Sequence, residues 1–196
     1  MQAITDTKHL TVQTLPPILV LTGEDVGQFE WLKKDILKKI GYDPSDLNYS
    51  YFDMKEASYD EVELDLVSLP FFADEKIVIL DHLLDVTTAK KRNLTDEDLK
   101  QFENYLENPS ESTRLVIFAE GKLDSKRRLV KLLKRDAQII EATTPKEQDL
   151  KRYFSGQAQE LGLHFVGDSL DQLLLKSGYD FGESHKNLAL LQAYKE

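Results

Sequence analysis

Short apolar runs alternate with amphipathic stretches over the first two thirds of the chain. Four runs are rich in β-branched residues and end at polar or turn residues, as buried strands do: 18–21, 76–81, 114–119 and 138–141. A weaker alternation over 47–53 predicts one more strand. Apolar residues between the runs recur at spacings of three and four, which predicts helices. Strands separated by helices indicate an α/β fold, with a parallel sheet covered by helices on both faces.

Capping residues mark several helix starts. Two capping boxes are predicted, at Ser58 with Glu61 and at Thr95 with Asp98. A helix is also expected between Val26 and Gly41, and a basic helix over 125–135. Residues 86–93 carry the weakest pattern and are predicted to form a loop.

The pattern changes at Thr144, which is followed by Pro145 and Glu147 and predicts a capped helix. Beyond it only helices are expected, over about 145–162, 168–178 and 182–196. We therefore expect an N-terminal extension (1–15), an α/β domain (16–143) and a small helical domain (144–196). The last amphipathic pattern is unfinished at Glu196, so we expect the chain to be a fragment of a longer protein.

Composition removes several classes of protein. Hydrophobic residues make up 41% of the 196 residues, which is enough for a packed core. The absence of cysteine excludes disulfides, thiolate metal sites and cysteine nucleophiles. No apolar run has the length of a membrane span, and the first 14 residues lack the apolar core of a signal peptide. The cytoplasm is the expected location, with no membrane partner.

The net charge of −10 favours protein partners, because the summed field repels phosphates. Basic side chains nevertheless gather late in the α/β domain, notably Lys126, Arg127, Lys131 and Lys134. One interpretation is a solvated helix face. The other is an electrostatic contact with an acidic neighbour or with DNA.

The turn after the first strand has the position of a P-loop but not its chemistry. A working P-loop needs glycine backbone, a Lys for the β- and γ-phosphates and a hydroxyl for magnesium. Gly23 and Gly27 are present, but Gln28 stands at the Lys position and Phe29 at the hydroxyl position. Two acidic residues in the turn add negative charge, which also suits an ordinary helix start. We expect neither nucleotide binding nor any other cofactor; a divergent P-loop ATPase is the alternative.

Other catalytic patterns are incomplete. The run 76–81 resembles the metal-side strand of P-loop ATPases and ends in Asp81. His82 follows where the catalytic version carries an acidic residue that orients water. The histidines lack metal-ligand spacing, and no glycine elbow presents a serine. The sequence therefore predicts no catalytic residue and no metal site.

The segment Ser68-Leu69-Pro70-Phe71-Phe72 is the most unusual one. Pro70 ends the preceding helix and stiffens the turn. Two adjacent Phe in a connection do not easily face one core. Either both rings close the end of the sheet, which would make the protein a structural scaffold, or they form an apolar plug for a partner's pocket.

Taken in order, these features resemble a known family. A degenerate P-loop at 23–29, the Ser-Leu-Pro-Phe-Phe segment, the strand 76–81 and the stretch 114–134 resemble the delta subunit of the bacterial DNA polymerase III clamp loader, in the form found in low-GC Gram-positive bacteria. The resemblance covers nearly the whole chain. It implies an AAA+-like fold with a RecA-like domain, a helical lid and a third collar domain, which would be absent here.

The resemblance also implies a role in DNA replication. Members bind the sliding clamp (beta subunit) and open the ring without hydrolysing ATP, while sibling subunits consume ATP. The other clamp-loader subunits, tau/gamma and delta prime, are the expected partners. The clamp-binding element is a serine, a leucine and an aromatic residue, which Ser68, Leu69, Phe71 and Phe72 match, with Pro70 making it one residue longer. Which Phe fills the deepest pocket stays open. ATP-sensing arginines have no counterpart in the lid, where no Arg follows Arg152.

Overall fold

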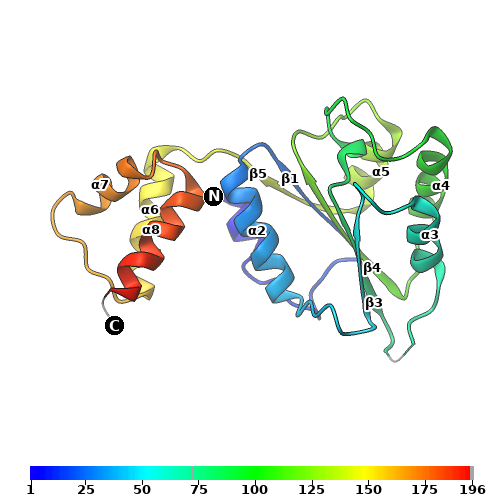
Figure 1. Cartoon of the computed structure of the whole chain (residues 1–196), viewed down its shortest axis with the longest axis horizontal. Helices are drawn as coiled ribbons and strands as arrows, with labels where there is room; N and C mark the ends of the chain where they lie inside the picture. The colour runs from blue at the N-terminus through cyan, green and yellow to red at the C-terminus, as the bar shows by residue number, and fades with distance from the viewer. Residues whose placement is uncertain (72, 195–196) are drawn as a thin grey trace.

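The computed structural model describes residues 1–71 and 73–194 (Figure 1). Within these residues, five parallel strands form one sheet in the order β2-β3-β4-β1-β5. They are β1 (Ile18–Gly23), β2 (Tyr49–Asp53), β3 (Lys76–Asp81), β4 (Thr113–Glu120) and β5 (Gln138–Ala142). The predicted α/β class with a parallel sheet is confirmed, and each predicted run lies in a strand.

Helices cover both faces of the sheet (Figure 1). On one face, α3 (Tyr59–Val67), α4 (Asp96–Glu107) and α5 (Arg128–Asp136) pack over alternate residues of β1, β3 and β4. On the other, α1 (Gln2–Thr7) and α2 (Val26–Lys39) cover the intervening residues. Because β1, β3 and β4 are buried on both faces, they carry continuous apolar runs rather than alternating ones. The first 15 residues contribute Ala3, Leu10 and Leu15 to the core under α2.

Three further helices form a separate cluster on the far side of α2 from the sheet (Figure 1). They are α6 (Glu147–Glu160), α7 (Ser169–Lys176) and α8 (Phe181–Ala193), and they share a core of their own. Trp31 of α2 packs into this core and stacks on His185 of α8, with the ring centroids 4.9 Å apart. None of the described helices is long and apolar enough to cross a membrane.

The predicted capping boxes of α3 and α4 are confirmed, with reciprocal hydrogen bonds at Ser58 with Glu61 and at Thr95 with Asp98. The box predicted at Thr144 is wrong. Helix α6 begins at Glu147, and Lys146 is its N-cap without a side-chain cap bond. Thr143 is held towards α2, because its carbonyl accepts a hydrogen bond from Gln28.

Two other element starts shift because short aspartate turns precede them. Helix α5 begins at Arg128 rather than at 125, since the carboxylate of Asp124 accepts from the Lys126 amide at 3.1 Å. Strand β2 begins at Tyr49 rather than at 47, since Asp46 accepts from the Asn48 amide at 2.9 Å. The predicted loop 86–93 follows a 3-10 turn, η1 (Leu84–Val86), and is irregular from residue 87.

Candidate functional site

The turn at the carboxyl end of β1 is packed tightly against other backbone. Gly23 has a φ of +127°, and its amide and carbonyl both pair with Gly121, at 2.9 and 2.7 Å. A Cβ at Gly23 would lie 2.1 Å from the carbonyl oxygen of Ala142. The Asp25 side chain caps α2 by accepting from the Gln28 amide at 2.8 Å. The glycine therefore serves close backbone packing at this position.

The two positions where a P-loop carries its lysine and hydroxyl both lie inside the protein. Gln28 is fully buried and donates through Nε2 to the Thr143 carbonyl at 3.2 Å, and Phe29 is 2% exposed in the core beneath α2. Gly27 faces the start of α8, where an added Cβ would lie 2.9 Å from the Gly182 amide nitrogen. The amino end of α8 thus packs directly against the turn.

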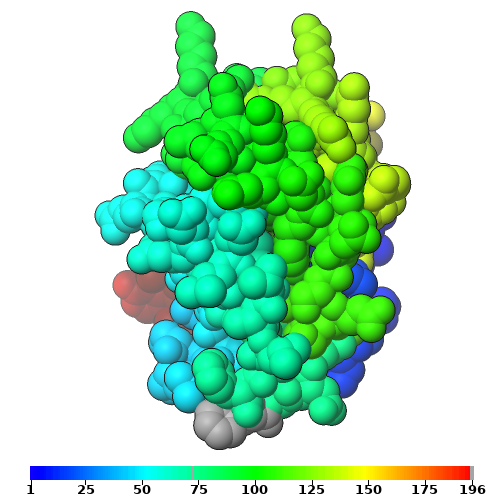
Figure 2. Space-filling model, turned by 90° about the vertical axis from the view of Figure 1, so that its right-hand side faces the viewer, coloured from blue at the N-terminus to red at the C-terminus, as the bar shows by residue number. Residues whose placement is uncertain are grey.

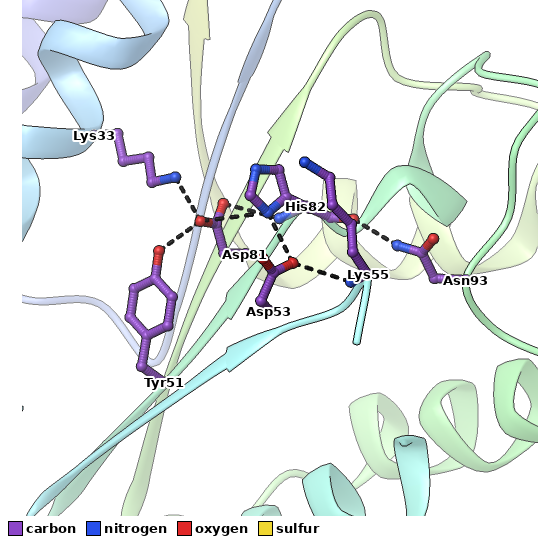
Figure 3. A network of polar contacts seen from close by, with 7 residues as sticks. All are labelled: Lys33, Tyr51, Asp53, Lys55, Asp81, His82 and Asn93. Carbon is purple, nitrogen blue, oxygen red and sulfur yellow. Dashed lines mark hydrogen bonds and ion pairs between the residues drawn. The ribbon is translucent and has the colours of Figure 1, made fainter. Parts of the chain in front are cut away.

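Asp81, at the end of β3, lies in a polar network (Figure 3). Its carboxylate accepts from Lys33 Nζ and from the Tyr51 hydroxyl, both at 2.5 Å, and from the His82 amide at 2.8 Å. The Asp81 side chain is only 5% exposed. Burial and the bond to Asp81 raise the pKa of Tyr51, so its hydroxyl remains a donor. Lys33 therefore supplies the positive charge beside this carboxylate.

His82 extends the network to the end of β2. Its backbone is left-handed, with a φ of +56°, and its carbonyl accepts from Asn93 at 2.8 Å. Its ring Nδ1 lies 2.9 Å from Asp53 (Figure 3). Although burial opposes ionisation of Asp53, hydrogen bonds from the Lys55 amide and the His82 ring outweigh it and lower its pKa. No group of three or more potential metal ligands occurs among the described residues.

The segment predicted to bind a partner forms a corner between α3 and β3. Leu69 and Phe71 are 76% and 80% exposed, whereas Ser68 and Pro70 are half-buried. The interpretation of Phe71 as a core residue is therefore wrong, because the corner turns its ring outward. Phe72 lies outside the described residues, so its role stays a prediction. We call residues 68–71 the apolar corner.

Two residues of α3 enlarge this apolar surface and were not singled out from the sequence. Leu64 and Val67 are 71% and 57% exposed. They lie three residues apart on α3, on the opposite side from the buried Val62 and Leu66. The signal was present in the sequence, because α3 carries more apolar residues than one buried face can accommodate.

The four predicted basic residues differ in how they are engaged. Arg127 is held by Asp124 at 3.1 Å and by the Asp85 carbonyl, and Lys134 donates to the Ser125 hydroxyl at 2.7 Å. Lys126 and Lys131 are exposed. Arg127 therefore has a structural role, whereas Lys134 is exposed like Lys126 and Lys131, and all three stay candidates for an outside contact.

A second basic segment lies beside the first. Residues Lys90, Lys91 and Arg92 are exposed in the loop that follows η1, which joins the next loop through a bridge between Thr87 and Leu123. Figure 2 shows the segments around residues 90 and 126 at one end of the molecule, with side chains projecting, and the segment around residue 70 at the other end. The sequence shows the Lys-Lys-Arg run, but not its proximity to Lys126.

Comparisons with known proteins agree with this architecture. The solved Bacillus subtilis DNA clamp loader delta protein superposes with a TM-score of 0.74 at 21% identity, over 98% of this chain and 57% of that one. A DNA polymerase III gamma subunit-related protein from Thermotoga maritima gives a TM-score of 0.52 at 16% identity, over 97% and 58%. These two likenesses show a shared fold, which is the predicted AAA+-like one.

Sequence comparison goes further than the fold. The DNA polymerase III subunit delta of Bacillus subtilis is 30% identical over 137 residues, which cover 69% of this chain and 40% of that protein. The chain thus spans less than two thirds of the length of each of these relatives. Residues 19–143 match the family described as DNA polymerase III, delta subunit. The chain therefore belongs to the DNA polymerase III delta subunit family.

Proposed function

We propose that this protein binds the sliding clamp through its apolar corner and helps to open the ring during clamp loading, without hydrolysing ATP. The observation that carries the proposal is the exposure of Leu69 and Phe71, at 76% and 80%, on a corner stiffened by Pro70. Exposed aliphatic and aromatic side chains on a fixed backbone are suited to fill a partner's pocket, because little conformational freedom is lost on docking.

Ring opening requires that the partner's opened form offer the better surface. A ligand shifts an equilibrium only by the difference between its affinities for the two states. The exposed Leu64 and Val67 next to the corner supply additional apolar area that such a surface could cover. The corner therefore binds the clamp, and the remainder of the contact surface distorts the ring towards its open form.

The absence of ATP hydrolysis is also proposed from the site. Gln28 and Phe29 are buried where a P-loop needs a lysine and a hydroxyl, and Asp81 is paired with Lys33. The alternative is a divergent P-loop ATPase. A titration with ATP and magnesium decides between them: measurable turnover that is lost on changing Gly23 or Gln28 would support the ATPase.

Within the whole loader, we infer that the protein works as one member of a hetero-oligomer with the tau/gamma and delta prime subunits. The family assignment supports this inference. Contact with DNA inside that assembly is the role we assign to Lys126 and Lys131, because both are exposed and basic on an otherwise acidic protein.

The test is calorimetric titration of the protein against the sliding clamp of the same organism. Leu69→Ala combined with Phe71→Ala should weaken binding by about a hundredfold or more, since burial of each side chain contributes roughly 1.5–3 kcal/mol. A matched control is Leu175→Ala with Tyr194→Ala, which removes another exposed Leu and another exposed aromatic residue, 63% and 88% exposed, from the helical cluster. A folded corner variant with wild-type affinity would show that the corner is not the binding site.

A further inference from the structure

The last turn of α3 ends against the first residues of two neighbouring strands. Lys76 begins β3 and Thr113 begins β4, and the two are opposite each other in the sheet register. Both are nearly fully buried, at 5% and 3% exposure. The helix stops at Ser68, where the backbone becomes extended, with φ −70° and ψ 150°. Carbonyl groups of the last turn therefore need hydrogen-bond donors from outside the helix.

The two strands provide those donors. The Lys76 ammonium donates to the Asp65 backbone carbonyl, and its Nζ lies 3.3 Å from the Asp65 carboxylate. The Thr113 hydroxyl donates to the Leu66 carbonyl at 3.2 Å. A cation at this end of a helix is also favoured by the helix dipole. The carboxyl end of α3 is thus attached to the sheet by side chains.

Ser68 belongs to the same polar cluster. Its hydroxyl accepts from Lys76 Nζ at 2.7 Å and donates to the Asp65 carbonyl at 3.2 Å. The side chain therefore points towards the sheet, whereas Leu69, the next residue, is 76% exposed. A buried ammonium is costly unless it is fully hydrogen-bonded, so its three partners are held in a fixed arrangement. Ser68 is thereby fixed at the base of the corner.

We propose that Lys76 is a positioning residue for partner binding, which holds the apolar corner in its docking conformation through Ser68 and the end of α3. On this view Ser68 supports binding through Lys76 and does not contact the partner. The inference rests on the proposed function, because it assumes that the corner docks. Its physical basis is that a corner ordered in advance loses less conformational entropy when it binds.

The test uses Lys76→Met, Ser68→Ala and the double variant, with association and dissociation rates measured by surface plasmon resonance on immobilised clamp from the same organism. Circular dichroism first establishes a temperature at which each variant is folded. Lys76→Met should bind about tenfold more weakly, mainly through slower association. Ser68→Ala should weaken binding alone but add nothing to Lys76→Met. Lys33→Met is the control, since it removes another ion-paired lysine, 14% exposed, whose partner Asp81 lies at the opposite end of β3.

The outcomes separate the inference from the function on which it rests. If Leu69→Ala with Phe71→Ala abolishes binding while Lys76→Met binds normally, the inference is wrong. Equal losses in Lys76→Met and Lys33→Met would also overturn it, because they would indicate general destabilisation. Additive losses for Ser68 would mean that Ser68 contacts the partner itself. If the wild-type protein does not bind the clamp, the proposed function fails instead. Lys76→Gln, which keeps a donor, replaces Lys76→Met if the latter does not fold.

Discussion

Acid should weaken the attachment of the helical cluster to α2 through one histidine. The ring of His185 stacks on Trp31 at an interplanar angle of 16°, and its Nε2 lies 2.9 Å from the Tyr153 hydroxyl. Burial lowers the pKa of His185 to about 4. Nε2 of a neutral ring accepts a hydrogen bond from the Tyr153 hydroxyl, whereas Nε2 of a protonated ring can only donate one. We predict that His185→Gln, which keeps an acceptor but does not titrate, removes part of the acid sensitivity of the fold.

Proton linkage gives the direction and the magnitude of this change in the free energy of unfolding. The pKa of His185 is lower in the folded protein, at about 4, than the usual histidine value of 6.5. Above pH 6.5 the ring is neutral in both states, so its full contribution to stability is present. As the pH falls below 6.5, the unfolded chain binds a proton that the folded protein excludes, and stability is lost until about pH 4. At pH 5 the loss from this residue is about 2 kcal/mol, which its partial exposure to water will reduce somewhat.

The assay uses Trp31, the single tryptophan of the chain, as a fluorescent reporter of the contact. Urea unfolding at about pH 7.5 and pH 5 gives the free energy of unfolding of the wild type and of His185→Gln. Carboxylates such as Asp53 titrate in both proteins, so the difference between the two pH dependences isolates His185. Equal losses in the two proteins, or an NMR-determined pKa of His185 near 6.5, would refute the reasoning.

Three further changes test other parts of the molecule. Gly23→Ala should destabilise the fold by about 3 kcal/mol or more, measured by thermal unfolding, because the new Cβ would lie 2.1 Å from a backbone oxygen; an unchanged melting temperature would contradict this. Lys33→Met should cost about 3 kcal/mol in urea unfolding by leaving the buried Asp81 carboxylate without its cation, and adding Asp81→Asn should restore part of the loss. Lys126→Glu with Lys131→Glu should weaken binding to duplex DNA, and identical DNA binding would argue against the assigned contact. The same variant should leave the clamp affinity nearly constant at moderate salt but alter its salt dependence.

The strands and the capped helices could be predicted because their signals are local. A strand buried on both faces needs consecutive apolar residues, so the Ile18 and Lys76 runs are visible without any knowledge of their neighbours. The Ser58 and Thr95 boxes bring together residues three positions apart. The box expected at Thr144 failed for a non-local reason, since the chain there is drawn towards α2 by a bond from Gln28.

The polar pairs of the site could not be predicted because they join distant parts of the chain. Lys33 and Asp81 are 48 residues apart, and the sequence around either residue does not predict that the other is its partner. Lys76 opens a strand in the sequence as an ordinary polar boundary residue, yet it is 5% exposed and holds the end of α3. The sequence could show that the phosphate-binding residues are missing. The burial of Gln28 and Phe29 in their place depends on tertiary packing, so only the structure shows it.

The two ends of the sheet therefore differ in which side chains are left available to a partner. At the carboxyl ends of the strands, where P-loop proteins hold phosphates, the Gln28 Nε2 and the Asp81 carboxylate already have partners within the protein. A ligand there would have to displace buried hydrogen bonds, which is costly. At the amino end of β3 the polar groups face inward on Lys76, and Leu69 and Phe71 remain in water. Binding energy is thus available at the second end, where apolar area can still be buried, and this asymmetry favours a protein partner over a nucleotide.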